Sequence, residues 1–158
     1  MKQLLMCCLT VIVLAACATL TPEQKVQRAQ QVEQAINNRH LYIDVRTAQS
    51  ARGFTRHVND YSLEISNDTV RSYLPYYGRA WNVPYGGGSA LNFTELTTDW
   101  TVTQPKAGQW KLRFTVRHEQ DEHLYSIDLY DNGAAYISVQ SRERELMNYE
   151  GAFDFDRK

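Results

Sequence analysis

Hydrophobic positions in residues 21–38, TPEQKVQRAQQVEQAINN, follow a helical spacing. Four apolar residues recur three or four positions apart: Val26, Ala29, Val32 and Ile36. Thr21 precedes Pro22, and Gln24 follows three residues after Thr21, which is typical of the capping box that begins a helix. The pattern predicts a helix over residues 22–37. Because its apolar stripe is thin, we expect this helix to contact the rest of the domain along one narrow edge.

After residue 38 the hydrophobic period changes to two, which is typical of half-buried strands. The alternating segments are 41–46, 61–66, 70–73, 100–103, 110–117, 125–129 and 135–139, with a last one inside 147–153. Trp100 and Val102 are expected to face inward, and Asn132-Gly133 is typical of a type I′ hairpin turn. The sequence predicts a mainly β (α+β) fold: one N-terminal helix, then an antiparallel sheet of about eight or nine short strands over 39–154. The pattern leaves open whether the sheet curls as a small barrel or as a sandwich.

The first seventeen residues, MKQLLMCCLTVIVLAAC, have the composition of a bacterial export signal. Lys2 is followed by an apolar run at 4–13, which is shorter than the roughly 20 residues that span a bilayer. Residues 14–17, LAAC, resemble the lipobox, in which the cysteine is lipidated after cleavage. We therefore expect Cys17 to carry acyl chains such as palmitate. A plain signal peptide cleaved after Ala18 is the competing interpretation.

This signal predicts the organisation of the chain and the place where it works. Residues 1–16 are expected to be a lipoprotein signal peptide, 17–21 the lipidated cysteine with a short linker, and 22–158 a single domain. Two or more acyl chains hold a protein firmly on a membrane. We expect the bacterial cell envelope as the location, with the protein anchored by its lipid in the outer membrane and facing the periplasm.

Charge and cysteine content exclude several functions. The chain has 17 basic and 18 acidic side chains, a net charge of −1, which does not provide the basic face that a nucleic-acid partner requires. The three cysteines are at positions 7, 8 and 17. Removal of the signal leaves Cys17 alone, with its sulfur used by lipid, so disulfides and thiol chemistry are not expected in the domain.

Three polar segments contain residue types that occur in chemical sites. His118 and His123, with the acids in 119–122, could hold a divalent cation at a hairpin tip, but a solvated turn has the same composition. The segment GGGSA at 86–90 lacks the G-x-S-x-G elbow of a serine hydrolase. SRERE at 141–145 is typical of a solvated connection. The sequence therefore predicts no catalytic residue, no metal site and no cofactor.

Aromatic residues and glycines are concentrated in residues 72–93, SYLPYYGRAWNVPYGGGSALNF. One interpretation is a lid of rings over an open end of the sheet, formed near the strand end by Leu74, Tyr76 and Ala80. The other is a recognition patch for an envelope protein, a peptide or a glycan, because long aromatic connections often bind partners. The residues predicted for this patch are Tyr77, Arg79, Trp81 and Tyr85.

Five segments resemble the DUF4251 family, bacterial envelope lipoprotein-like domains of unknown function: RHLYIDV, YSLEISNDTVRSYLPYYGRA, WKLRFTV, YSIDLYDNGAAYISVQSRER and NYEGAF. The resemblance covers residues 30–154 and implies a β domain without assigned catalytic residues. We expect a lipid-anchored, non-catalytic binding or scaffolding module. The alternatives are a hydrolase acting on envelope polymers, which requires facing carboxylates, and a small β-barrel carrier of an apolar ligand.

Overall fold

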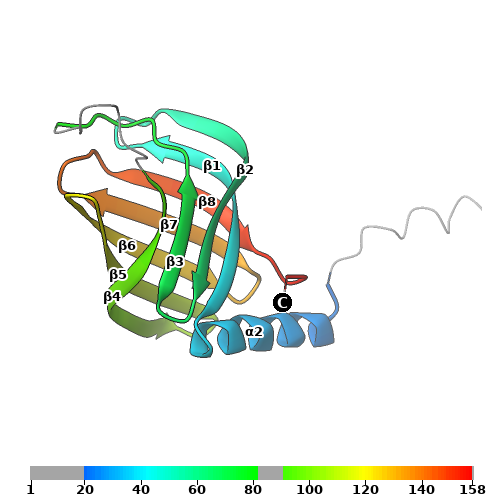
Figure 1. Cartoon of the computed structure of the whole chain (residues 1–158). Coiled ribbons are helices and arrows are strands. Elements are labelled where there is room, and N and C mark those ends of the chain that lie inside the picture. The colour runs from blue at the N-terminus through cyan, green and yellow to red at the C-terminus, as the bar shows by residue number, and fades with distance from the viewer. Residues whose placement is uncertain (1–19, 82–90, 158) are drawn as a thin grey trace, which may run out of the picture.

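A computed structural model of the protein describes residues 20–81 and 91–157 (Figure 1). Within these ranges the elements are α2 (Pro22–Asn37), β1 (His40–Ser50), β2 (Thr55–Ser66), β3 (Thr69–Leu74), β4 (Leu91–Lys106), β5 (Gln109–His118), β6 (Asp121–Tyr130), β7 (Ala134–Ser141) and β8 (Met147–Phe153). Each strand pairs antiparallel with the next, and β8 pairs with β1, so the sheet is a closed barrel. The mainly β prediction is confirmed, and of its two forms the barrel is observed.

The helix begins and ends where the sequence predicts. The backbone N–H of Gln24 donates to Thr21 Oγ1 at 3.2 Å, and the backbone N–H of Thr21 donates to Gln24 Oε1 at 3.0 Å, which completes the capping box. Val32 and Ile36 are buried, whereas Val26 is 57% exposed. The helix lies across one end of the barrel (Figure 1) and contacts it along a narrow edge. Within residues 20–81 and 91–157, no helix is long and apolar enough to cross a membrane.

Large side chains lie in the barrel interior. Phe114, Tyr125 and Tyr149 are at most 1% exposed. The Phe114 ring stacks on Trp100 at 5.3 Å and on Tyr125 at 5.0 Å between centroids. An eight-stranded barrel is just wide enough for side chains to fill or to hold one small ligand, and these three rings occupy part of that interior.

Strand β4 departs from the predicted pattern. It extends from Leu91 to Lys106 instead of 100–103, and Val102, expected to face inward, is 40% exposed. The pairing with β5 shifts register between Thr98 and Thr101, and Asp99 has a φ of 54°. A bulge of this kind changes which side chains face the core. After the bulge, Trp100 is partly buried against the core. Val102 pairs with the fully buried Leu112, so it lies on the inner face as expected, although 40% of its surface stays exposed.

The hairpin between β6 and β7 has a different turn from the one expected. A type I′ turn needs positive φ at both central residues, but in this turn the positive φ is at Gly133, 86°. The backbone N–H of Gly133 donates to the Tyr130 carbonyl at 2.9 Å, and the Asn132 side chain accepts from the backbone N–H of Ala134 at 2.9 Å. The connection is a three-residue loop in which glycine takes the left-handed position.

Candidate binding surface

Four connections meet at the end of the barrel opposite the helix (Figure 1). They include residues 51–54, 75–81, 119–120 and 142–146. We call this end the loop end, and residues 75–81 the capping segment. Ala80 forms an isolated antiparallel bridge with Arg144, which places the capping segment directly against residues 142–146.

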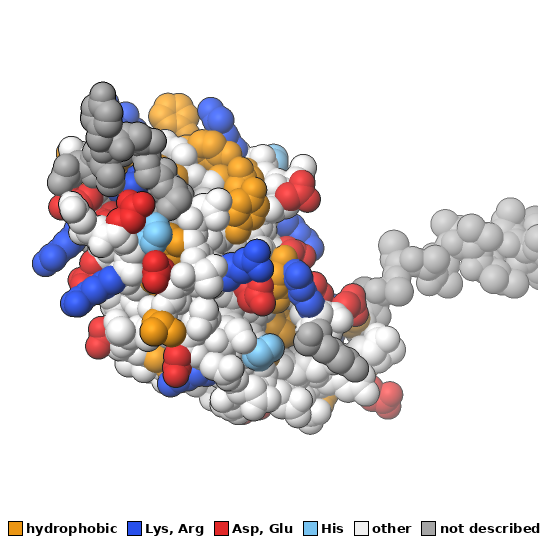
Figure 2. Space-filling model, viewed as in Figure 1, with side chains coloured by type: hydrophobic (Ala, Val, Ile, Leu, Met, Phe, Trp, Pro, Cys, Tyr) orange, Lys and Arg blue, Asp and Glu red, His pale blue; other side chains and the backbone are white. Residues whose placement is uncertain are grey.

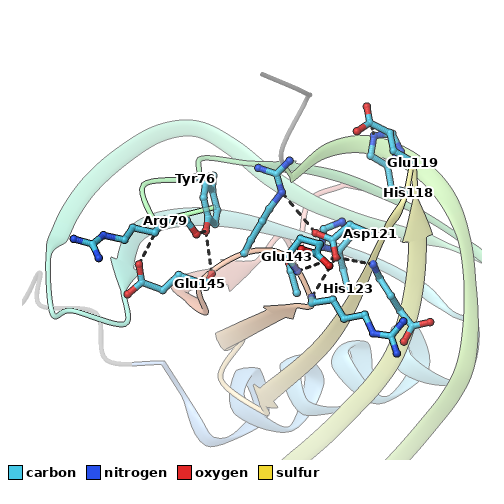
Figure 3. A network of polar contacts seen from close by, with 12 residues as sticks. Tyr76, Arg79, His118, Glu119, Asp121, His123, Glu143 and Glu145 are labelled. Carbon is cyan, nitrogen blue, oxygen red and sulfur yellow. Dashed lines mark hydrogen bonds and ion pairs between the residues drawn. The ribbon is translucent and has the colours of Figure 1, made fainter. Parts of the chain in front are cut away.

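The capping segment is held along its backbone by 142–146 (Figure 3). The Trp81 N–H donates to the Glu143 carbonyl at 2.9 Å, and the Glu145 N–H donates to the Arg79 carbonyl at 2.8 Å. The Arg79 N–H donates to a side-chain oxygen of Glu145, also at 2.9 Å. The capping segment therefore behaves as a short extra strand. The prediction that 141–145 is a solvated connection is wrong, because this stretch pairs with the capping segment.

Two tyrosine hydroxyls, one within the capping segment and one from the barrel core, hold the start of this segment in place. The Tyr76 hydroxyl donates to the Arg79 carbonyl at 2.5 Å and lies 3.3 Å from the Glu145 carbonyl. Burial raises the pKa of the Tyr76 hydroxyl, so it stays protonated and able to donate. From the core, Tyr149 donates to the Pro75 carbonyl at 2.8 Å.

A buried ion pair supports residues 142–146, which form the other side of the bridge between Ala80 and Arg144. Arg144 is 7% exposed, its Nε lies 3.7 Å from Asp121 Oδ2, and its guanidinium is 5.6 Å from the Tyr76 ring. Asp121 Oδ1 accepts from the N–H groups of Arg142 at 3.1 Å and Glu143 at 3.3 Å. The carboxylate of Asp121 thus fixes the backbone on which the capping segment rests (Figure 3).

The two histidines of the candidate metal site, His118 and His123, have other partners. His118 Nδ1 lies 2.9 Å from Glu95 Oε1, and His123 Nδ1 lies 2.6 Å from Ser141 Oγ. Both imidazoles stack on Phe93, at 4.6 Å and 5.3 Å. Burial lowers the pKa of His123. Over the described part of the chain, no three His, Cys, Asp or Glu side chains converge as a metal ion would require.

The capping segment presents a different set of side chains to solvent. Tyr77 is 41% exposed and Trp81 is 68% exposed. Arg79 is exposed, and its side chain points away from the polar network (Figure 3). We call Tyr77, Arg79 and Trp81 the rim surface. The other predicted patch residue, Tyr85, and the predicted lipidation site, Cys17, lie outside the described residues.

Nearby residues that the sequence did not single out add to this end of the barrel. Phe54 is 68% exposed in the β1–β2 connection. The Arg56 guanidinium lies 4.7 Å from the Tyr77 ring centroid, and Arg52 Nε lies 3.5 Å from Glu145 Oε1. Phe54 could have been noticed in the sequence, because it is a large apolar residue directly after Gly53 in a polar turn. On the face shown in Figure 2, the largest hydrophobic area lies toward the loop end, and charges of both signs are spread over the rest.

Comparisons with other proteins identify the fold and a family. The family model described as Domain of unknown function (DUF4251) matches residues 23–153. The crystal structure of a DUF4251 family protein from Bacteroides eggerthii DSM 20697 is similar, with a TM-score of 0.61, 12% sequence identity, and coverage of 82% of this chain and 91% of that chain. At that identity the likeness supports the fold alone. None of the curated proteins compared matches this chain.

Proposed function

The chain belongs to the DUF4251 family, and we propose that it is a lipid-anchored binding module of the bacterial envelope whose binding site is the rim surface. The observation that carries this proposal is the exposure of Tyr77 and Trp81 on a backbone held by hydrogen bonds to 142–146. Tyr, Trp and Arg are the residues most enriched among the energetic centres of interfaces. A backbone that is already fixed loses little entropy when a partner binds.

The position of the helix gives this surface an orientation. The lipobox at 14–17 puts the expected anchor at Cys17, and residues 18–21 can reach at most about 14 Å before the helix begins. The helix lies at the barrel end opposite the loop end (Figure 1). An anchor on the helix side therefore leaves the rim surface facing away from the bilayer. Its partner is then a molecule of the periplasm rather than the lipid surface that holds the protein.

The contacts at the loop end favour binding over catalysis. Asp121 and Glu145 accept hydrogen bonds from backbone N–H groups, and Glu145 also lies against Arg52. These acids hold the backbone in place, which indicates a structural role in the surface and not a catalytic one. The large rings of Phe114 and Tyr125, which are completely buried inside the barrel, favour a binding module over a carrier of an apolar ligand.

Site-specific photo-crosslinking in intact envelopes tests the proposal. A benzophenone amino acid is placed at Trp81 or, as a control, at Leu96, because the two side chains are 68% and 67% exposed. We expect a discrete crosslinked species from position 81 and none of the same mass from position 96. Arg79→Ala should abolish that species while changing the free energy of unfolding by less than about 0.5 kcal/mol.

Two results would contradict the rim surface as the binding site. One is the same pattern of crosslinks from both positions, which would indicate random collisions. The other is a loss of several kcal/mol of stability in Tyr77→Ala and Trp81→Ala, which would show that these rings serve as part of the lid.

A further inference from the structure

A groove of about 290 Å³ lies on the outer wall of the barrel, over β6, β7, β8 and β1. Strand register places its residues in cross-strand rows. Asp128 faces Tyr136, which faces Glu150. In the next row the order is Ser126, Ser138 and Asn148. The residues that alternate with them, such as Ile127, Ile137 and Tyr149, are buried in the core, so both rows point outward.

The size of the side chains explains why this wall is hollow. Ser126 and Ser138 are direct neighbours on adjacent strands, and two small side chains side by side leave space above the sheet. In the adjoining row, Tyr136 is 48% exposed and stands beside them. The serines therefore form a floor and the larger residues form a rim. The volume is at the lower end of small-molecule sites, about 300–1,000 Å³.

The groove has hydrogen-bonding capacity that the protein does not use. Among described residues, the side chains of Ser126, Ser138, Asn148 and Glu150 make no hydrogen bond or ion pair. Asp128 Oδ1 is buried without a hydrogen bond, although Lys111 Nζ lies 3.4 Å away at ion-pair distance. Proteins leave few buried oxygen atoms unpaired. The side chains of Ser126, Ser138, Asn148 and Glu150 can therefore accept hydrogen bonds from a polar ligand, and the hydroxyl and amide groups among them can also donate.

An aromatic ring lies in the same site. Tyr136 contacts Tyr130 edge-on, with centroids 5.9 Å apart and planes at 82°. The contact orients the Tyr136 ring while about half of its surface stays exposed. An apolar ring face surrounded by amide, hydroxyl and carboxylate groups matches a sugar, which has an apolar C–H face and a periphery of hydroxyls.

We propose that this groove binds a neutral glycan, with one sugar ring on Tyr136 and its hydroxyls hydrogen-bonded to Asn148, Ser138 and Glu150. An acidic polymer would be repelled by Glu150, which has no ion-pair partner among the described residues. An extended peptide gains its affinity mainly from an open sheet edge, whereas the backbone under the groove is already paired through the β6, β7, β8 and β1 ladders. The site shares no residue with the rim surface, so the two proposals can fail separately.

Calorimetric titration of the purified full-length protein tests the site, with N,N′,N″-triacetylchitotriose (chitotriose below) as the probe and maltotriose as a second neutral sugar. The acetamido group of chitotriose adds an amide that Asn148 can pair with. Tyr136→Ala should weaken chitotriose binding on the order of tenfold or more, and Ser138→Leu should abolish it by filling the floor. Tyr73→Ala is the matched control, because Tyr73 is 43% exposed and stacks on Tyr61. It should leave affinity unchanged.

Circular dichroism confirms that each variant is folded before it is titrated. Saturable binding of either sugar that is lost in Tyr136→Ala and Ser138→Leu but kept in Tyr73→Ala supports the proposal. No saturable binding of either sugar, or equal losses in Tyr136→Ala and Tyr73→Ala, overturns it.

Discussion

The hydroxyl of Tyr149 donates a hydrogen bond to the carbonyl oxygen of Pro75, 2.8 Å away. Tyr149 belongs to β8 and is 1% exposed, and Pro75 is the buried first residue of the capping segment. Burial raises the pKa of Tyr149, so the hydroxyl remains protonated and continues to donate. This contact joins the barrel core to the segment that carries the rim surface.

Tyr149→Phe should therefore destabilise the protein although it changes the side chain by one oxygen. The Pro75 carbonyl would remain buried without a partner, which costs about 1–3 kcal/mol. Chemical denaturation measures this change. Tyr136→Phe is the control, because the Tyr136 hydroxyl makes no hydrogen bond within the described residues, and its effect should stay within about 0.5 kcal/mol. Equal effects of the two substitutions would show that the contact with Pro75 contributes no stability.

Gly151→Ala tests how closely β8 approaches β1. A Cβ at position 151 would overlap the carbonyl oxygen of Asp44, next to the irregularity in β1 between Val45 and Thr47. The obstacle is backbone, which cannot rotate away, so we expect a loss of about 3 kcal/mol or more in thermal or chemical unfolding.

Gly53→Ala provides the comparison for Gly151→Ala. Gly53 has a φ of 83°, but a Cβ there meets nothing within 4 Å. Its cost should be about 1–2 kcal/mol, from backbone conformation alone. A smaller loss in Gly151→Ala than in Gly53→Ala would mean that the two strands can separate at this point.

His123 should make stability depend on pH. Burial lowers its pKa below the ordinary value of 6.5, and the nearby Asp121 carboxylate partly opposes this shift. The unfolded state then binds the proton more readily than the folded state. The stability that comes from a neutral His123 is therefore fully present above about pH 6.5. It is lost as the pH falls from there through the lowered pKa of His123 in the folded protein.

The measurement is the free energy of unfolding between about pH 7 and pH 5, for the wild type and for His123→Asn. Arg144, His118 and Glu119 also lie near this imidazole and are unchanged in the variant. The wild type should lose stability more steeply than His123→Asn over this range. Parallel curves would show that protonation of His123 is not coupled to unfolding.

Local signals account for what the sequence predicted about the fold. The capping residues Thr21 and Gln24 are three positions apart, and strand alternation has a period of two, so both can be read within a short window. The pairing of β1 with β8 joins residues such as Ala48 and Tyr149, which no local pattern connects. For this reason barrel closure remained one of two alternatives.

The candidate site was predictable in part for the same reason. The concentration of rings in 72–93 pointed to the rim surface, because composition is visible in sequence. The contact of Ala80 with Arg144 joins segments that are distant in sequence. The alternating charges of 141–145 predicted a solvated connection, but this contact buries part of it. The groove could not be predicted either. Ser126 and Ser138 are neighbours only in the register of β6 and β7, which the sequence does not give.

Cys17→Ser tests the predicted anchor. The variant should incorporate no labelled palmitate, and any exported protein should appear in the soluble fraction, because acyl chains supply the attachment. The helix offers no substitute, since Val32 and Ile36 pack against the barrel and Val26 is the exposed apolar residue at its start. Membrane fractionation with a palmitate label gives both readouts.

Two other cysteines provide the control for the anchor. Cys7→Ser and Cys8→Ser change the same chemical group inside the expected signal peptide, so both variants should keep the palmitate label and the membrane fraction. The label also separates lipidation from retention by an uncleaved signal, because an unprocessed precursor stays on the membrane unlabelled. If Cys17→Ser incorporates palmitate as the wild type does, the lipobox interpretation is wrong and another residue carries the attachment.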